Sequence, residues 1–222
     1  MVRLDEPQRA VNVLSRSVIQ SLEAWLISAC RVSPPPAWLL LEGNGRGSFA
    51  AGANLSEIAR LDGMAARQLS TAGQRLLRRI HNAPWPTAAL VAGHALGGGL
   101  DLAIACDLIG ATPDASFGHP GLARGFFTGW GGTVSLPAAT KGRRGISAML
   151  QAETLDARAA CRAGLIAYLA PEPQLRRRLV AGLEQLATWP RPALEAWRVS
   201  LRGAANQRLA QRLLELSRVD TV

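Results

Sequence analysis

Three consecutive glycines, Gly97-Gly98-Gly99, constrain the fold of this chain more than any other feature. An apolar run over residues 87–91 precedes them and indicates a short buried strand, and a helical pattern follows over residues 100–108. Without Cβ atoms, the backbone at this junction can turn sharply and a ligand can approach it closely. The free N–H groups and the dipole of the new helix favour negative charge. We therefore expect an anion site here, for a phosphate or an oxyanion.

The composition is that of a single globular protein. The chain has 222 residues, of which 48% are hydrophobic and 18% charged, enough for a sizeable core. No apolar run reaches the ~18 residues that span a bilayer. The N-terminus carries acid and proline where a signal peptide would be apolar, so we expect a cytoplasmic protein that binds no membrane.

The net charge is +9 and comes almost wholly from arginines spread along the chain. A basic balance is compatible with nucleic acid, but scattered arginines on amphipathic helices favour a solvated surface or an anionic small molecule. We therefore expect no nucleic-acid partner. The three cysteines, Cys30, Cys106 and Cys161, lie in apolar stretches and are expected to be buried thiols rather than a metal or disulfide framework.

Strand and helix patterns alternate along the chain, which predicts an α/β fold with a mainly parallel sheet and a helical C-terminal part. No linker is long enough to divide the chain into separate domains. Glycine-rich loops are expected over residues 117–121 and 125–132. The expected strands cover residues 2–4, 38–41, 87–91 and 165–169, and the expected helices cover 15–26, 56–60, 65–82, 100–108, 155–164 and two or three segments from 173 onward.

The common nucleotide-binding loops do not fit the glycine turn. A P-loop needs Lys and Ser or Thr directly after its glycines, but Leu100 and Asp101 follow here. A dinucleotide fingerprint that starts at Gly97 needs glycine where the chain has Leu102. The three histidines, His81, His94 and His119, have no Cys, Asp or Glu at ligand spacing, so no metal site is expected.

The order of motifs resembles the crotonase family, also called the enoyl-CoA hydratase/isomerase superfamily, from about residue 2 to residue 206. The resemblance implies an α/β fold of the crotonase (ClpP-like) kind, a spiral of ββα units. It implies a core over residues 1–172 and a C-terminal helical region over 173–222 that covers the acyl pocket and builds a homotrimer or hexamer. Compared with the family, this chain starts almost at the second strand and ends roughly one helix early. The motifs that carry the resemblance are residues 9–14, 49–55, 93–107, 117–120, 129–133 and 157–165.

The resemblance also implies what the glycines do. Family members bind acyl-CoA thioesters, or acyl groups on carrier proteins, and work through an enolate without a cofactor other than the CoA of the substrate. The motif positions assign the oxyanion hole to the backbone N–H groups of Ala53 and Gly98. Trp130 is expected either in the acyl pocket or as a buried aromatic, and Arg46 or Arg60 is a candidate for the CoA phosphates. The expected substrate-binding residues are Ala51, Gly52, Gly97, Gly121 and Trp130.

The acid and base positions depart from the family pattern. Its hydratases use two facing glutamates, and the corresponding positions here are Asp101 and Gly121. Asp101 keeps a carboxylate with a shorter reach, whereas Gly121 offers no side chain, so hydration by two carboxylates is not expected. Family members that make 1,4-dihydroxy-2-naphthoyl-CoA can also carry glycine there, with bicarbonate in place of the carboxylate.

His119 is a candidate base in place of the missing glutamate, since neutral imidazole accepts protons near pH 7. Against this, residues two apart on an extended segment lie ~6–7 Å apart. His94 is expected to pack in the core. The sequence thus favours an enzyme with Asp101 as its acid/base and His119 as a second candidate. Such an enzyme would carry out isomerisation, decarboxylation or a specialised hydration. The alternative is a non-catalytic thioester-binding or accessory subunit.

Overall fold

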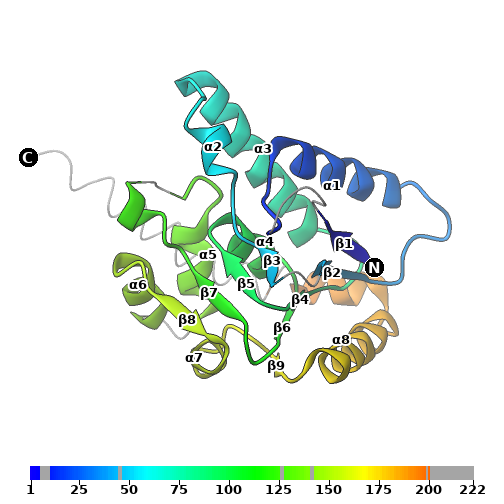
Figure 1. Ribbon diagram of the computed structural model, residues 1–222. Coiled ribbons are helices and arrows are strands. Elements are labelled where there is room, and N and C mark those ends of the chain that lie inside the picture. The colour runs from blue at the N-terminus through cyan, green and yellow to red at the C-terminus, as the bar shows by residue number, and fades with distance from the viewer. Residues whose placement is uncertain (6–10, 45–46, 126–127, 141–142, 199, 201–222) are drawn as a thin grey trace, which may run out of the picture.

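The computed structural model describes residues 1–198, except 6–10, 45–46, 126–127 and 141–142, together with residue 200. Its strands form two sheets (Figure 1). The larger sheet is parallel throughout, in the order β1-β2-β4-β6-β9. Its strands are β1 (Val2–Leu4), β2 (Leu39–Gly43), β4 (Thr87–Val91), β6 (Leu108–Ala111) and β9 (Tyr168–Leu169).

The smaller sheet has the order β3-β5-β7-β8, in which β8 alone is antiparallel to its neighbour. From β2 to β7 the strands alternate between the two sheets: β2, β4 and β6 enter the larger sheet, and the strand after each enters the smaller one. Helices follow each pair, so the repeating ββα spiral expected from the sequence is confirmed. The strands are β3 (Ser48–Ala50), β5 (His94–Leu96), β7 (Ser116–Gly118) and β8 (Thr154–Asp156).

Helices cover both sheets. In Figure 1, α1 and α3 lie side by side, and α8 packs against β4, β6 and β9. Capping side chains begin several helices, as Ser15, Asp62 and Asp156 each accept from a backbone N–H three residues on. The helices are α1 (Arg16–Ala29), α2 (Leu55–Ile58), α3 (Gly63–His81), α4 (Gly98–Ile104), α5 (Gly132–Ala139), α6 (Arg143–Leu150), α7 (Ala157–Arg162) and α8 (Glu172–Ala187), with a 3₁₀ turn over Leu122–Arg124.

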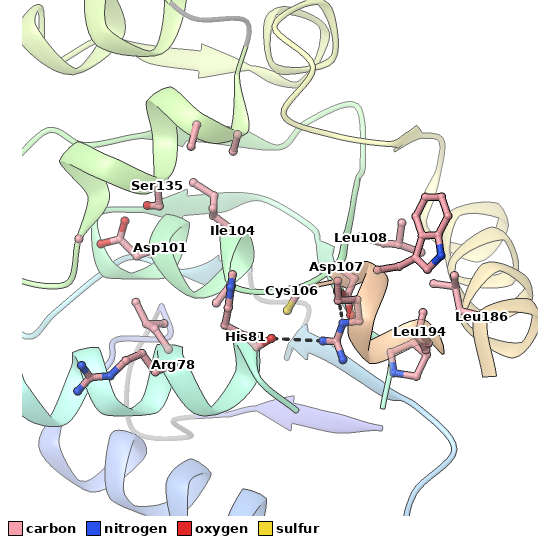
Figure 2. Close-up of a pocket in the computed structure, with 18 of the residues that line it drawn as sticks. Arg78, His81, Asp101, Ile104, Cys106, Asp107, Leu108, Ser135, Leu186 and Leu194 are labelled. Atoms are coloured by element: carbon pink, nitrogen blue, oxygen red, sulfur yellow. Dashed lines mark hydrogen bonds and ion pairs between the residues drawn. The ribbon is translucent and has the colours of Figure 1, made fainter. Parts of the chain in front are cut away.

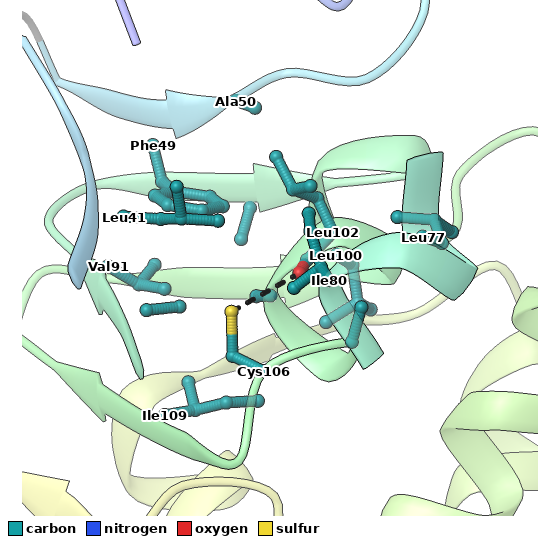
Figure 3. Close-up of a cluster of buried hydrophobic side chains, with 14 of the residues drawn as sticks. Leu41, Phe49, Ala50, Leu77, Ile80, Val91, Leu100, Leu102, Cys106 and Ile109 are labelled. Atoms are coloured by element: carbon teal, nitrogen blue, oxygen red, sulfur yellow. Dashed lines mark hydrogen bonds between the residues drawn. The ribbon is translucent and has the colours of Figure 1, made fainter. Parts of the chain in front are cut away.

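The main core lies between the sheets and the helices α1, α3 and α4. Figure 3 shows Phe49 of β3 and Val91 of β4 packed toward Leu100 and Leu102 of α4, all of them fully buried. Helix α4, which starts at the glycine turn, is thus fixed on its inner side by the core. Within the described residues, no helix combines the length and the apolar character that a bilayer crossing needs.

Several element boundaries differ from the sequence expectation. The helix expected over residues 100–108 begins at Gly98 and ends at Ile104, because Leu108 already enters β6. The first residues of the helix expected over 155–164 form β8, and the loop expected over 117–121 contains the end of β7. Strands β7 and β8 have three residues each and lie beside glycine-rich or helical patterns, so neither gives a periodic signal of its own.

Three side-chain expectations are wrong. Cys30 and Cys161 are exposed, and only Cys106 is a buried thiol, because Cys30 caps the end of α1 beyond its buried stripe. His94 does not pack in the core; it is exposed on β5 and lies 2.7 Å from the hydroxyl of Ser116 on β7. The division of the chain at residue 172 stays a prediction.

Candidate functional site

The glycine turn joins β5 to α4. Gly97 has φ +51° and ψ −125°, a conformation that side-chain-bearing residues rarely adopt, and its N–H donates to the Gly118 carbonyl at 2.8 Å. A Cβ on Gly99 would lie 2.1 Å from the Ala50 carbonyl oxygen, so only glycine lets α4 start against β3. Gly98 is the first residue of α4, and its N–H therefore has no acceptor within the helix.

The second small-residue segment, Ala51-Gly52-Ala53, lies beside this turn. A Cβ on Gly52 would be 2.9 Å from the Leu96 carbonyl oxygen and 3.6 Å from the Gly98 nitrogen. The Leu14 N–H donates to the Gly52 carbonyl at 2.8 Å, which ties the segment to the chain before α1. The fold thus brings the two segments with the predicted oxyanion-hole residues, Ala53 and Gly98, next to one another.

Asp101 and His119 form a buried pair. Asp101 lies in the first turn of α4, and His119 directly follows β7. The His119 Nε2 is 3.1 Å from the Asp101 Oδ1, and the two residues are 5% and 2% exposed. The hydroxyl of Thr128 donates to the other carboxylate oxygen, Oδ2, at 3.2 Å. The pair can hold and move a proton, because a carboxylate and an imidazole in contact each accept one.

Gly121 supplies no group to this site. It precedes the 3₁₀ turn, with a backbone conformation of φ −62° and ψ −38° that any residue adopts. The conformation therefore does not require glycine, and the lack of a second carboxylate is a property of the sequence rather than of the fold.

A cavity of about 1180 Å³ opens beside α4. Asp101 lies in its wall at one end, and Figure 2 shows the cavity extending past Ile104 toward Leu186 and Leu194. Its wall comes from α3, α4, α5, α8 and residues 193–198, and it is largely apolar. The volume exceeds the range of about 300–1,000 Å³ that is usual for small-molecule sites.

Trp130 separates the glycine turn from helix α3. A Cβ on Gly73 would be 2.1 Å from the Trp130 Cε2, and a Cβ on Gly98 would be 2.5 Å from its Cζ3. The indole therefore occupies a slot between α3 and α4 that two glycines leave open. The indole is half-buried and lines the cavity, and its place in an acyl pocket stays a prediction.

Only some of the predicted site residues meet at the cavity. Asp101 and Trp130 line it, and His119 lies behind Asp101. Of the candidates for the CoA phosphates, Arg60 is exposed, and Arg46 lies outside the described residues. Within the described part of the chain, no group of three His, Cys, Asp or Glu side chains is arranged to hold a metal ion. The backbone around the glycine turn is formed by Ala51, Gly52, Ala53, Gly97 and Gly98.

Sequence reasoning missed two polar residues of the site. Thr128 binds Asp101, and the hydroxyl of Ser135, on α5, is buried in the cavity wall. No sequence pattern marks Thr128 as a site residue, because it lies in a glycine-rich loop whose conformation the sequence does not determine. A polar residue in the otherwise apolar stretch 134–139 was a usable signal for Ser135.

The comparison with protein families agrees with this architecture. The sequence model described as enoyl-CoA hydratase/isomerase matches residues 1–219. The chain therefore belongs to the enoyl-CoA hydratase/isomerase family, the crotonase superfamily.

Individual relatives are similar over most of the chain. A crotonyl-CoA hydratase of Syntrophomonas wolfei is 33% identical over 158 residues, which cover 71% of this chain and 60% of that protein. An enoyl-CoA isomerase/hydratase of Mycosarcoma maydis, fer4, is 31% identical over 218 residues, or 95% of this chain and 79% of that one. The crystal structure of an enoyl-CoA hydratase/isomerase family protein from Silicibacter pomeroyi superposes with a TM-score of 0.79 at 30% identity, covering 96% of this chain and 93% of that chain.

Proposed function

We propose that this protein transfers a proton at Cα of an acyl-CoA thioester through an enolate, with Asp101 as the acid/base. The observation that carries the proposal is the Asp101 carboxylate, which is buried at the end of an apolar cavity, accepts a hydrogen bond from Thr128 and lies in contact with His119. The relatives are named for reactions of enoyl-CoA thioesters, and enoyl groups gain or lose a proton at this carbon.

The backbone around the glycine turn would stabilise the enolate. When Cα loses its proton, negative charge moves to the thioester oxygen, and the N–H groups of Ala53 and Gly98 are the donors proposed for it. Preorganised donors of this kind contribute about 3–4 kcal/mol each. Ala51, Gly52 and Gly97 would let the thioester approach, because none has a side chain larger than a methyl group.

His119 would act on Asp101 as well as on the proton. An imidazole in contact with a carboxylate fixes its orientation and can relay its proton. One acid/base pair suffices for isomerisation, for protonation after decarboxylation, or for a hydration in which the same pair serves both carbons. Hydration by two glutamates is not proposed, because Gly121 lacks the second carboxylate.

The uptake of deuterium at Cα of butyryl-CoA in D₂O tests the proposal, since exchange needs only proton abstraction and an enolate. We expect exchange by the unaltered protein and a loss of about 10³-fold in Asp101→Asn, within the usual range for a general acid/base. The exposed Asp114 provides a matched control, and Asp114→Asn should exchange normally. If a panel of thioesters, including 3-enoyl and malonyl types, shows neither exchange nor turnover, the catalytic proposal fails.

A second candidate function is a non-catalytic thioester-binding or accessory subunit, and the glycine at position 121 is the observation that favours it. Calorimetry with acetyl-CoA distinguishes the two, because an accessory subunit would bind the thioester without exchanging its protons. Acyl-carrier-protein thioesters belong in the same binding experiment. A homotrimer or hexamer remains part of the proposal and is tested by sedimentation velocity.

A further inference from the structure

Three buried polar atoms at the Asp101 end of the cavity make no aligned hydrogen bond within the described residues: the Asp101 Oδ1, the His119 Nε2 and the Ser135 Oγ. The contact of 3.1 Å between the first two is close, but it is not directed as a hydrogen bond. Buried polar atoms without partners are rare in folded proteins, and they commonly mark a bound water or a catalytic group.

Two of these atoms face the start of α5, and the third lies on that helix. A Cβ on Gly132, in the first turn of α5, would be 2.5 Å from the His119 Nε2 and 2.7 Å from the Asp101 Oδ1. Ser135 lies three residues further along the same helix, and residues at that spacing share a helix face. Figure 2 shows the Ser135 hydroxyl and the Asp101 carboxylate turned toward one another.

The hydrogen-bonding properties of these three side chains determine which ligand group they could bind. A carboxylate, as at Asp101, only accepts hydrogen bonds, whereas the Ser135 hydroxyl both donates and accepts. A hydroxyl oxygen satisfies both, since it can donate to Asp101 and accept from Ser135 or from His119. An anion is disfavoured here because the Asp101 carboxylate repels its charge.

We propose that Ser135, Asp101 and His119 together hold the water that adds to Cβ of a 2-enoyl thioester, or equally the hydroxyl of the 3-hydroxyacyl product. Ser135 would thereby do part of what a second carboxylate does elsewhere. This inference rests on the proposed function, because the same Asp101–His119 pair must also protonate Cα.

The step balances without a further reactant. The water oxygen forms a bond to Cβ while one O–H bond of the water breaks, and that proton passes to the Asp101–His119 pair. The electron pair of the Cα=Cβ bond moves into the thioester as an enolate. Cα then takes the proton from the pair, so the net change is the addition of one water and the pair returns to its starting state.

The test compares two reactions of the same site. Hydration of trans-2-enoyl-CoA, followed by the loss of its conjugated absorbance, needs the bound water, whereas α-proton exchange of butyryl-CoA does not. In Ser135→Ala we expect hydration to fall by about 10²-fold, the usual cost of losing one preorganised donor. The α-proton exchange of butyryl-CoA should fall by less than about 3-fold. A general loss of structure would instead lower both reactions.

Two further variants complete the experiment. Ser135→Thr keeps the hydroxyl and should retain hydration within about 10-fold of the unaltered protein. Thr133→Ala removes an exposed hydroxyl from the same helix and should change neither reaction.

Each other outcome overturns the inference. If the unaltered protein exchanges α-protons but does not hydrate enoyl-CoA, the water site is wrong while the proposed function stands. If it does neither, both fail. An equal loss of both reactions in Ser135→Ala would assign Ser135 a structural role only. Hydration that depends on added bicarbonate would place an anion, not a hydroxyl, between these groups.

Discussion

His119 Nε2 lies 3.1 Å from Asp101 Oδ1, although the two residues belong to different ββα units. The pairing of β5 with β7 brings them together, since Leu96 pairs with Gly118. Beyond this pair, the chain after β5 passes through the glycine turn and reaches Asp101, whereas His119 is the first residue after β7. The register of the smaller sheet therefore brings the proposed acid/base pair together.

Gly132→Ala should disrupt this pair. The added Cβ would come 2.5 Å from the His119 ring and 2.7 Å from the Asp101 Oδ1, so one of the two side chains must move. We expect α-proton exchange to fall by about 10²-fold, the cost of a displacement of about 1 Å, and the free energy of unfolding to fall by about 1–3 kcal/mol. Exchange rates and denaturant melts measure the two effects.

Gly63→Ala is the matched control for that variant. Gly63 begins α3, and no atom lies within 4 Å of the position a Cβ would take. Its exchange rate should equal that of the unaltered protein, and its free energy of unfolding should be the same or up to about 1 kcal/mol higher. A normal exchange rate in Gly132→Ala would show that the close packing of the pair does not matter for the chemistry.

The strand and helix patterns predicted a mainly parallel α/β fold, and the family resemblance predicted its ββα spiral, but neither predicted the packing of the site. The apolar runs before Gly97 and around residues 39–41 are long enough to give a signal, whereas β3, β5, β7 and β8 have three residues each. Pairing between these short strands decides that His119 meets Asp101, and pairing depends on the whole chain. The position of Ser135 depends in turn on how α5 packs against α4, which no local pattern encodes.

Trp130 should restrict the shape of the acyl group, because its ring fills the slot between Gly73 and Gly98 next to Asp101. Trp130→Ala opens that slot. We expect the ratio of kcat/KM for 3-methylbutyryl-CoA over butyryl-CoA, both measured by deuterium uptake, to rise by about 10-fold or more, the scale of one or two methyl groups in an apolar pocket. An unchanged ratio would mean that the acyl group does not pass the indole.

Arg198 and Asp107 should hold the far end of the cavity together. The Arg198 Nε donates to the Asp107 Oδ1 at 2.8 Å, and the same guanidinium donates to the carbonyl oxygens of Ala83 and Trp85. Arg198 is 9% exposed, so Asp107→Ala leaves its charge buried and unpaired. We expect a loss of about 3–5 kcal/mol in the free energy of unfolding. Arg198→Met in the same melts should cost less, because the Asp107 carboxylate that it leaves keeps its two hydrogen bonds from Thr87.

Glu23 should make stability depend on acid pH. A hydrogen bond from Arg75 holds the pKa of the Glu23 carboxyl below its ordinary value of 4.5, and Arg79 adds to this against the opposing effect of burial. Because the folded state favours the charged carboxylate, the contribution is complete above pH 4.5 and is lost as the pH falls through the lowered pKa. Glu23→Gln should therefore cost about 1–2 kcal/mol at pH 7, and the difference from the unaltered protein should shrink toward pH 3.

Urea melts at the two pH values measure this dependence, and Glu153→Gln is the control. Glu153 pairs with Arg144 at 2.7 Å, but both side chains are substantially exposed, so its loss should cost less than about 0.5 kcal/mol at either pH. The side chain of Glu23 is only 9% exposed and joins α1 to α3 through two arginines. A cost of Glu23→Gln that is the same at pH 7 and pH 3 would mean that the charge of this carboxylate contributes nothing to the packing of α1 on α3.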